Sequence, residues 1–536
     1  MFVGVARAAP SIPLVWSISS SRCWAVAGLI SITLLAIGCT TVGPDYVRPS
    51  ADVSGQWMEV ADARVKPEPA EYREWWTVFD DPVLNALVEI AYKENLTLRS
   101  AGIRIMEARA ALGISVGTQY PQVQEGTGEI SQIWLSENVN PAGVTPTTTN
   151  FDVWRLGFDV GWELDFWGKF RRGVESANAD LGAAIANYDD ILVSLVAEVA
   201  ATYVLIRTFE ERLNVARDNV KIQERSFQIT GVRFRNGAVT ELDVQQAKAT
   251  LRNTQALIPQ LQTGLRQSQN ALGVLLGMPP RDLQDVIGGP RTIPTAPPDV
   301  AVGMPTELLR RRPDIRRAER EVAAQSARIG MVKSDLYPRI TLAGSFNLTA
   351  DDAAGVFMGD SFSGFGGPAF VWPLFDYGRI TNNVRVQDAR FQQLAVQYQN
   401  AVLKAAQEVE DALVAFLRAQ EQVKFLADSA EASRRWVNLS LIQYREGVID
   451  FTPVLLAQDF LTQQEDRLAE TTGAIARNLI AVYKAIGGGW EIRAGKEFVP
   501  MEIREEMQER TSWGDLLEAA AQEPKPVSII PGWPDW

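Results

Sequence analysis

The 536-residue sequence contains no histidine and only two cysteines, Cys23 and Cys39, both close to the N-terminus. Without histidine, the chain lacks the commonest general base, the usual serine–histidine triad and most zinc sites. Because no cysteine follows Cys39, the body of the protein can form neither a disulfide nor a thiol cluster. These absences argue against many classes of enzyme, although they leave room for a hydrolase that relies on carboxylates.

The 52 lysines and arginines are outnumbered by 65 aspartates and glutamates, and the formal net charge is −13. An acidic chain is a poor partner for nucleic acid, because its excess of negative charge repels phosphates. The apolar fraction of 46% is nevertheless enough for a large buried core, so we expect a folded protein. No apolar run of membrane-spanning length follows Cys39, and we therefore expect no transmembrane helix in the body.

An uncharged apolar run covers residues 24–38, and Arg22 lies two residues before its start. Its length suits the core of an export signal better than a membrane-spanning helix, which needs about 20 residues. The run ends at Gly38-Cys39, which resembles the site where bacterial lipoproteins are cleaved and acylated on the thiol. We therefore expect residues 1–38 to be removed and Cys39 to carry covalent lipid such as palmitate. Ala36 stands where leucine is usual, so a cleaved signal with an incidental cysteine is the alternative.

The rest of the chain contains an internal duplication. One set of segments repeats at an offset of 210 residues, and these segments are Trp162–Gly168 with Trp372–Gly378 and Phe234–Gly237 with Tyr444–Gly447. A second pair, Tyr120-Pro121 and Tyr337-Pro338, repeats at an offset of 217. The seven-residue difference lies between the Tyr-Pro pair and the tryptophan, where a loop can vary in length.

Each half predicts a helix, two strands and a long helical hairpin, in that order. The predicted ranges are 95–118, 122–134, 156–166, 170–235 and 241–276 in the first half, and 313–334, 340–348, 364–375, 380–445 and 452–486 in the second. Apolar residues at alternating spacings of four and three predict a helix-packing seam along each long helix. Gly237 and Gly447 mark the hairpin tips, where a positive φ is often needed, although they could be plain turn glycines.

The predicted strand at 156–166 alternates strictly between large apolar residues and small or acidic ones. A transmembrane β-strand needs about 9–11 such residues, with lipid on one face and water on the other. A single strand of this kind could belong to a soluble sandwich, but matching pairs in an exported chain favour a barrel. The smallest barrels have about 8 strands, so at least two copies must assemble. Asp159, Glu163 and Asp165 are then candidates for the water-filled lumen, with the periplasmic mouth as the alternative place for Asp165.

Taken together, these features resemble the outer-membrane factor family of TolC-like channels, especially its OprM, CusC and NodT lipoprotein branch. The resemblance covers about residues 39 to 490, most of the mature chain. The motifs that carry it are Gly38-Cys39-Thr, Val42-Gly-Pro-Asp-Tyr, Trp75-Trp76, Arg312-Pro-Asp314, both Tyr-Pro pairs, and Tyr444-Arg-Glu-Gly447 with Leu456-Ala-Gln458. Each motif is weak alone, but their order and the duplication make the set specific.

The resemblance implies an α+β membrane protein that is not an enzyme and needs no metal or other cofactor. Three chains would form a 12-stranded transmembrane β-barrel, continued by a long α-helical coiled-coil tunnel in the periplasm. The channel would pass small toxic compounds or drugs out of the cell and contribute to multidrug resistance. Its partners would be outer-membrane lipid, a periplasmic adaptor protein, and an inner-membrane pump of the resistance-nodulation-division or a related class.

The expected organisation has six parts along the chain. These are a signal peptide (1–38), a lipidated N-terminal equatorial segment (39–94), the first repeat (95–279), an equatorial linker (280–312), the second repeat (313–489) and an irregular C-terminal tail (490–536).

In the family, the inner helices near the hairpin tips close the periplasmic end, and the adaptor docks at the tips. By that resemblance, Gly237 and Gly447 mark the docking surface and Asp243 is a gate candidate. With Thr240 as N-cap, Asp243 could equally be an ordinary acid in the first turn of a helix. Leu456 stands where the family often has an aspartate, so the gate there would be apolar and would close by dewetting.

Three other functions explain less of the sequence. A type I protein-secretion channel would share the fold and differ only in its partner. A lipid-anchored hydrolase could use Glu163 and Asp165, because residues two apart on a strand point to the same face. A structural coiled-coil tether would leave the paired amphipathic strands without a role.

Overall fold

The computed structural model describes residues 41–68, 72–136 and 150–517. The expected signal peptide and Cys39 lie outside these ranges. The described residues form two compact units, which we name the strand unit (up to 43, 118–172 and 330–381) and the helical unit (44–117, 173–329 and from 382 onwards). Each unit takes residues from both halves of the duplication, so the compact units differ from the expected repeats.

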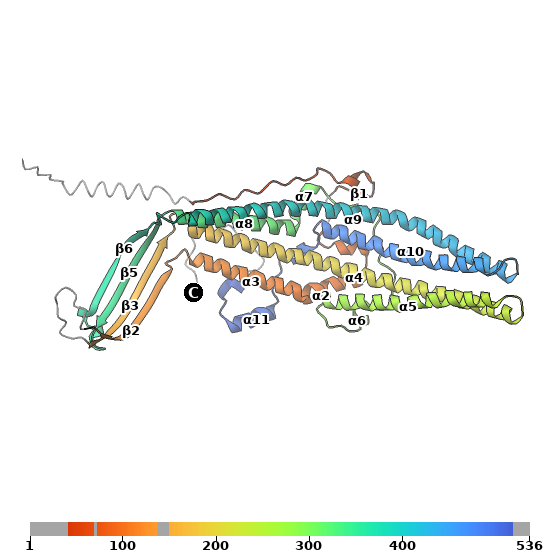
Figure 1. Cartoon of the computed structure of the whole chain (residues 1–536), viewed down its shortest axis with the longest axis horizontal. Coiled ribbons are helices and arrows are strands. Elements are labelled where there is room, and N and C mark those ends of the chain that lie inside the picture. Colours follow the sequence, from red (N-terminus) through yellow and green to blue (C-terminus); the bar gives the residue numbers. More distant parts are fainter. Residues whose placement is uncertain (1–40, 69–71, 137–149, 518–536) are drawn as a thin grey trace, which may run out of the picture. The chain divides into compact units, whose positions relative to one another are not determined.

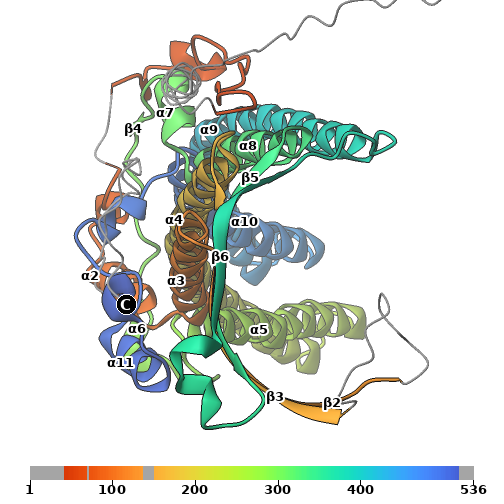
Figure 2. The same ribbon diagram turned by 90° about the vertical axis from the view of Figure 1, so that its left-hand side faces the viewer.

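The strand unit holds one antiparallel sheet in which the strands follow the order β2, β3, β5, β6 (Figure 1). The strands are β2 (Val123–Trp134), β3 (Asn150–Leu164), β5 (Arg339–Ala350) and β6 (Phe362–Val371). Each half of the duplication contributes one hairpin, and β3 pairs with β5 to join the two hairpins. The sheet is curved, as the turned view shows (Figure 2). All four predicted strands are present, although β3 begins earlier and β6 ends earlier than expected.

The helical unit is built around the long helices that the duplication predicts. The helices are α3 (Leu96–Gly117), α4 (Lys169–Arg235), α5 (Glu241–Leu275), α8 (Pro313–Lys333), α9 (Arg379–Arg445) and α10 (Thr452–Ala485). Every one begins and ends within one residue of its predicted bounds. Periodicity locates these ends well because each helix stops at a proline or a glycine turn.

The core of the helical unit lies along the predicted packing seams. Leu192, Val199 and Ile206 of α4, in the first half, are fully buried. They share one hydrophobic core cluster with Leu413 and Phe416 of α9, in the second half. By length and composition α4 could cross a membrane, which we did not expect, but 67% of its most apolar window is buried within the protein. Helix packing therefore accounts for the apolar character of α4.

The segments expected to be irregular contain further short elements. The strands β1 (Val65–Lys66) and β4 (Val300–Ala301) pair in parallel. The short α-helices there are α2 (Pro82–Glu94), α6 (Gln284–Ile287), α7 (Pro305–Arg311) and α11 (Met501–Arg510), and the 3₁₀ turns are Met58–Ala61, Trp75–Phe79, Trp490–Arg493 and Gly514–Leu517. Three further 3₁₀ turns, Ser334–Leu336, Gly355–Phe357 and Gly359–Ser361, lie within the second repeat. The expectation of irregular structure was therefore wrong for α2 and α11.

Helix α2 begins in a way that the sequence could have revealed. The Asp81 carboxylate accepts hydrogen bonds from the amides of Val83 (2.8 Å) and Leu84 (3.2 Å), and Pro82 occupies the first turn. An aspartate N-cap followed by proline is a strong start signal for a helix. Nearby, the Trp75 ring stacks on Tyr483 of α10 at 5.1 Å, which fixes the N-terminal segment on the helical core.

Candidate functional site

One face of the sheet is an exposed apolar surface. Phe158 of β3 lies directly opposite Phe346 of β5, and the Phe346 ring is 6.2 Å from that of Phe362. The side chains of Phe346, Phe362 and Phe370 are 56%, 59% and 72% exposed. A row of exposed aromatic residues on a sheet is unusual when water covers it, and it is what a lipid-facing surface requires.

The opposite face of the sheet carries most of its charge. Asp159 lies directly opposite Glu125 of β2, while the neighbouring Glu129 forms a 3.0 Å ion pair with Arg155. Glu163 shares this face, opposite Thr341 of β5. Like charges directly across a strand pair repel, so this acidic face would attract cations. The sequence indicated Asp159 and Glu163 but missed the two β2 glutamates, because only the strand register places them beside Asp159.

Asp165 lies one residue beyond the end of β3, at the turn into α4, and its assignment as a lumen candidate stays a prediction. Strand β3 ends at Leu164, and the Asp165 carboxylate accepts hydrogen bonds from the amides of Phe170 (3.1 Å) and Arg171 (2.9 Å). An ion pair of 3.2 Å with the Arg171 side chain completes the cap of α4. The carboxylate pair that a hydrolase would need is therefore absent from the strand, because Asp165 serves as the helix cap.

Asp376 caps α9 in a similar way in the second half. Its carboxylate accepts hydrogen bonds from the amides of Ile380 (2.7 Å) and Gly378 (3.0 Å). These two amides hold the pKa of the Asp376 carboxyl below its usual range. Each turn from the sheet into a long helix is thus closed by an aspartate, as expected at a helix N-terminus.

At the other end of α4 and α9, the two hairpin tips contact each other through Arg233. Its guanidinium donates to the carbonyls of Tyr444 and Arg445 and lies 4.6 Å from the centre of the Tyr444 ring. Both carbonyls belong to the last turn of α9, where the helix dipole favours a cation. Arg233 was missed, although its counterpart at an offset of 210 is Gln443, a difference that could have indicated a special role.

The predicted tip residues adopt the local structure that their types suggest. Gly237 and Gly447 have φ values of 69° and 75°, so each occupies the left-handed region that favours glycine. The Asp243 carboxylate accepts hydrogen bonds from the Thr240 amide and hydroxyl, both at 2.9 Å, and forms a capping box with it. Leu456 is 58% exposed on α10. A gating role for Asp243 and Leu456 stays a prediction.

Behind the tips lies a small buried cluster that the sequence did not indicate. Ala247, Tyr444, Phe451 and Val454 form it, and the Tyr444 and Phe451 rings are 5.1 Å apart. Burial raises the pKa of the Tyr444 hydroxyl. The two tips of one chain are therefore packed together as well as hydrogen-bonded.

The Arg312-Pro-Asp314 motif has a structural role in the helical unit. Arg312 donates to the Asp314 carboxylate at 2.8 and 3.0 Å, to Glu408 of α9 at 2.7 Å, and to the Ala485 carbonyl at the end of α10. A single buried arginine thus ties the start of α8 to two of the long helices. A planar guanidinium with five donors suits such a junction.

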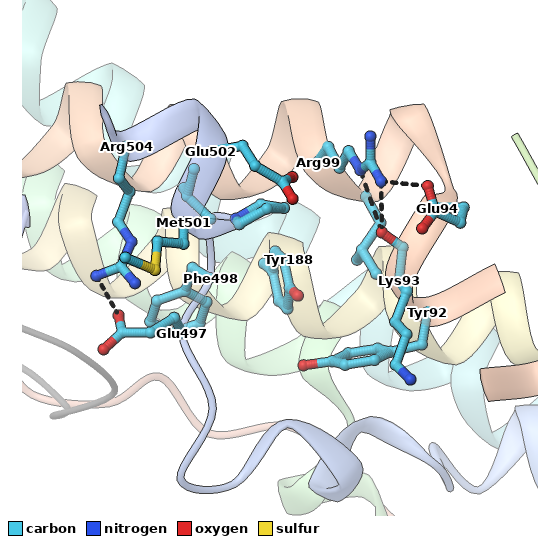
Figure 3. A pocket seen from close by; sticks show the side chains of 13 residues that line it. Tyr92, Lys93, Glu94, Arg99, Tyr188, Glu497, Phe498, Met501, Glu502 and Arg504 are labelled. Atoms are coloured by element: carbon cyan, nitrogen blue, oxygen red, sulfur yellow. Dashed lines mark hydrogen bonds and ion pairs between the residues drawn. The ribbon is translucent and has the colours of Figure 1, made fainter. Parts of the chain in front are cut away.

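Beside α11, the helical unit has a surface pocket of about 330 Å³ (Figure 3). Tyr188 and Phe498 line it, and Arg99 at its edge donates to Glu94 at 2.5 Å and to the Lys93 carbonyl at 2.9 Å. We find no nucleophile paired with a base among the lining residues. Within the ranges that the structure describes, no group of three or more cysteine, aspartate or glutamate side chains is placed to hold a metal ion.

Comparison with known proteins agrees with a channel. The outer membrane efflux protein family matches the chain twice, over residues 87–278 and 304–488. Nodulation protein T from Rhizobium leguminosarum bv. trifolii is 30% identical over 85% of this chain and 96% of its own length. The toluene efflux pump outer membrane protein TtgF from Pseudomonas putida is 27% identical over 86% of this chain and 96% of its own length.

Solved structures of outer-membrane channels also match this chain. The outer-membrane channel OprN matches with a TM-score of 0.79 and 34% identity, over 84% of this chain and 99% of its own. The chain is thus an outer-membrane efflux channel protein and not an enzyme, with its helical part in the periplasm. On the double family match, the shared fold and the two-faced sheet, the chain belongs to the outer membrane efflux protein family.

Proposed function

We propose that three copies of this chain form the exit channel of a tripartite efflux pump. The observation that carries the proposal is the four-stranded sheet, with most of its exposed aromatic residues on one face and most of its acidic residues on the other. Four strands are too few to close a barrel, and three copies would supply twelve. In this assembly, the aromatic face contacts lipid and the face with Asp159 and Glu163 lines a water-filled lumen.

The hairpin tips are the part of the chain that we assign to the pump partners. A periplasmic adaptor would dock around Gly237 and Gly447 and connect the channel to an inner-membrane pump of the resistance-nodulation-division or a related class. Val448 beside the second glycine is 71% exposed, as a docking residue should be. A covalent lipid on Cys39 would anchor each chain, since each buried methylene adds about 0.8 kcal/mol of membrane affinity.

The transported compounds are proposed to be small toxic molecules. The relative TtgF is named for toluene efflux, which supports small molecules over the proteins that a type I secretion channel would carry. The acidic lumen face would favour cations and weakly repel anions. Selection among compounds would then lie mainly with the pump.

Deletion of the gene in its own host tests this proposal. We expect the deletion strain to become several-fold more susceptible to a panel of small toxic compounds, and the full chain to restore resistance. The variant Val448→Arg should reach the outer membrane in normal amounts yet fail to restore resistance, because a charge at the tip would block docking. Unchanged susceptibility together with a loss of secreted proteins would instead support the type I channel.

A further inference from the structure

Phe365 of β6 is an exposed aromatic residue on the acidic face of the sheet. It lies opposite Ser345 of β5, which in turn lies opposite Asp159 of β3, so the strand register places Phe365 on the face that carries Asp159. The Phe365 side chain is 69% exposed. Phe362 and Phe370 of the same strand lie on the other face, because they are an odd number of residues away. Contact with lipid therefore explains those two rings but leaves Phe365 unexplained.

The duplication shows that the position of Phe365 is polar in the first half. β6 follows β3 at an offset of 210 residues and β5 follows β2 at 216, so Phe365 and Ser345 are the counterparts of Arg155 and Glu129. Arg155 and Glu129 lie opposite each other and form a 3.0 Å ion pair. The second half thus has a phenylalanine and a serine where the first half has an ion pair.

Two carboxylates lie in the same row across the sheet as Phe365. The row contains one residue from each strand, in the order Glu125, Asp159, Ser345 and Phe365. Neighbouring strands are about 4.8 Å apart, so the backbone of Asp159 is about 10 Å from that of Phe365. The like charges of Glu125 and Asp159, directly opposite each other, favour a cation beside them.

The rows on either side of this one contain neither a charged nor an aromatic side chain. They consist of Val123, Gly161, Ala343 and Gly367 on one side and of Thr127, Gly157, Asn347 and Ser363 on the other. Gly367 is the next residue of β6 on the same face as Phe365, and a Cβ on it would meet no atom within 4 Å. The space beside the Phe365 ring is therefore open to a bound molecule.

The width of the proposed barrel decides whether Phe365 could close it. Twelve strands that are about 4.8 Å apart and tilted by about 40° give a circumference of about 75 Å and a diameter of about 24 Å. A phenylalanine side chain is much shorter than the corresponding radius of about 12 Å, so three rings could not meet in the centre. Phe365 would therefore act by contacting a passing molecule and not by blocking its path.

We propose that Phe365 is a specificity-determining residue of the channel, which together with Asp159 and Glu125 binds organic cations that carry an aromatic group. This inference rests on the proposed function, because Phe365 meets passing compounds only if its face lines a lumen. The aromatic group of the compound packs on the Phe365 ring, and its positive charge lies beside the two carboxylates. Compounds whose charge is separated from the aromatic group by several carbon atoms can reach both.

The binding is weak, as passage through a channel requires. A compound must be attracted enough to enter the lumen and held loosely enough to leave it. One exposed ring and two carboxylates in contact with water provide a small attraction, so we expect dissociation constants on the order of 1 mM. A neutral aromatic compound gains only the ring contact, and an aromatic anion is repelled by the carboxylates. The site therefore separates three classes of compound.

Nuclear magnetic resonance of a soluble probe tests this site in the full-length protein in lipid nanodiscs. Transfer of saturation from the protein to the probe detects binding in the millimolar range, and empty nanodiscs provide the background. The probe is 4-phenylbutyl-trimethylammonium. Tetramethylammonium has the charge without the ring, and 4-phenylbutanesulfonate has the ring with the opposite charge. We expect the probe to bind several-fold more tightly than either of these compounds.

Two pairs of variants separate the ring from the charge. Phe365→Ser should weaken binding of the probe about fivefold and leave tetramethylammonium unaffected, because only the ring contact is lost. Phe362→Ser is its control, since Phe362 is 59% exposed on the other face of the same strand. Asp159→Asn should weaken binding of both cations. Its control is Glu163→Gln, because Glu163 shares the acidic face but lies about 13 Å along β3. Phe365→Trp should preserve binding.

Three results would overturn the proposal. The first is equal binding of the probe and tetramethylammonium by the unchanged protein, and the second is an equal effect of Phe365→Ser and Phe362→Ser. The third is a Phe365→Ser variant that binds the probe normally but dissociates into single chains at a lower temperature, since the ring would then only join copies. If the unchanged protein in nanodiscs contains single chains, the proposed function fails and this inference fails with it.

Discussion

At the residue scale, Arg233 joins the two hairpin tips of one chain. Arg233 donates to the carbonyls of Tyr444 and Arg445 at the end of α9 and covers the Tyr444 ring, in addition to the Gly447 amide that donates to the Tyr444 carbonyl. A hydrogen bond to a charged group contributes about 1.5–3 kcal/mol. One side chain can therefore decide how freely the second tip moves relative to the first.

Replacing Arg233 by alanine should loosen the second tip. We expect the backbone amides around residues 444–451 to exchange their hydrogens about tenfold faster, because the carbonyl contacts and the ring contact are lost together. Hydrogen-exchange mass spectrometry measures this directly. Arg235→Ala, two residues away in the same last turn and exposed, is the matched control and should leave the exchange unchanged. Equal acceleration in both variants would contradict the role of Arg233.

Two glycine-to-alanine substitutions near the first tip should change its stability in opposite directions. Gly237→Ala should destabilise the first tip by about 1–2 kcal/mol, because Gly237 has a φ of 69°. Gly231→Ala should stabilise it by about 0.5–1 kcal/mol, because Gly231 lies inside α4, where alanine is the better helix former. Neither Cβ would meet an atom closer than 3.8 Å, so packing does not confuse the comparison. Hydrogen exchange at the tip measures both effects. If both variants exchanged faster, or both slower, than the unchanged protein, the argument would be refuted.

At this scale the sequence was informative only where the residue type itself requires a conformation. Gly237, Gly447 and the Thr240–Asp243 capping box could be predicted for that reason. Arg233 and Asp165 could not, because what each contacts depends on where a neighbouring helix begins or ends. Asp165 looked like part of the strand pattern until the end of β3 at Leu164 placed it at the start of α4.

At the element scale, the strands show where a sequence repeat can mislead. The Tyr-Pro pairs repeat at 217, but the hairpin pairings set β2 against β5 at an offset of 216, so the first half has one extra residue. Gln122 is that residue, and its side chain accepts from the Glu163 amide at 2.7 Å, in place of a backbone partner. A register drawn from the Tyr-Pro pairs alone would be wrong by one residue and would exchange the two faces of β2.

The helices were easier to predict because their ends depend on local signals. The heptad spacing, the prolines and the glycine turns all act within a few residues of each helix end. The short helices α2 and α11 were missed, although Leu84, Leu87, Val88 and Ala91 give α2 a helical spacing that could have indicated it, whereas α11 buries only Met507. For α11, the packing of Met507 in the core cluster is what reveals an ordered helix.

A buried ion cluster ties three elements of the helical unit together and supports a stability prediction. Asp189 of α4 is fully buried and contacts Arg316 of α8 (3.2 Å) and Arg493 beyond α10 (3.0 Å), with Trp490 next to both guanidinium groups. Removing one member of a buried pair typically costs about 3–5 kcal/mol, because the other charge is left uncompensated.

We therefore expect Asp189→Asn to lower the thermal unfolding midpoint of the detergent-solubilised protein clearly, as followed by tryptophan fluorescence. The neighbouring Asp190→Asn is the control, since the Asp190 side chain is 31% exposed and makes one 3.2 Å contact with Arg317. A half-exposed pair contributes about 0–1 kcal/mol, so its loss should change the midpoint little. Similar shifts in both variants would show that the cluster around Asp189 is not a stabilising junction.

At the scale of the whole molecule, the account rests on the incompleteness of a single chain. One copy leaves an aromatic face exposed on its sheet, open edges on β2 and β6, and the Tyr377 ring fully exposed. Each of these features is unfavourable in water for an isolated chain. Lipid on one side and further copies at both edges would satisfy all of them.

The number of chains in the assembly tests this account most directly. Protein extracted from the outer membrane in mild detergent can be measured intact by native mass spectrometry. We expect a complex of three chains, because three four-stranded sheets complete a barrel with a wet lumen while one cannot. A stable monomer would contradict the account, because one four-stranded sheet can neither pair its own edges nor enclose a channel.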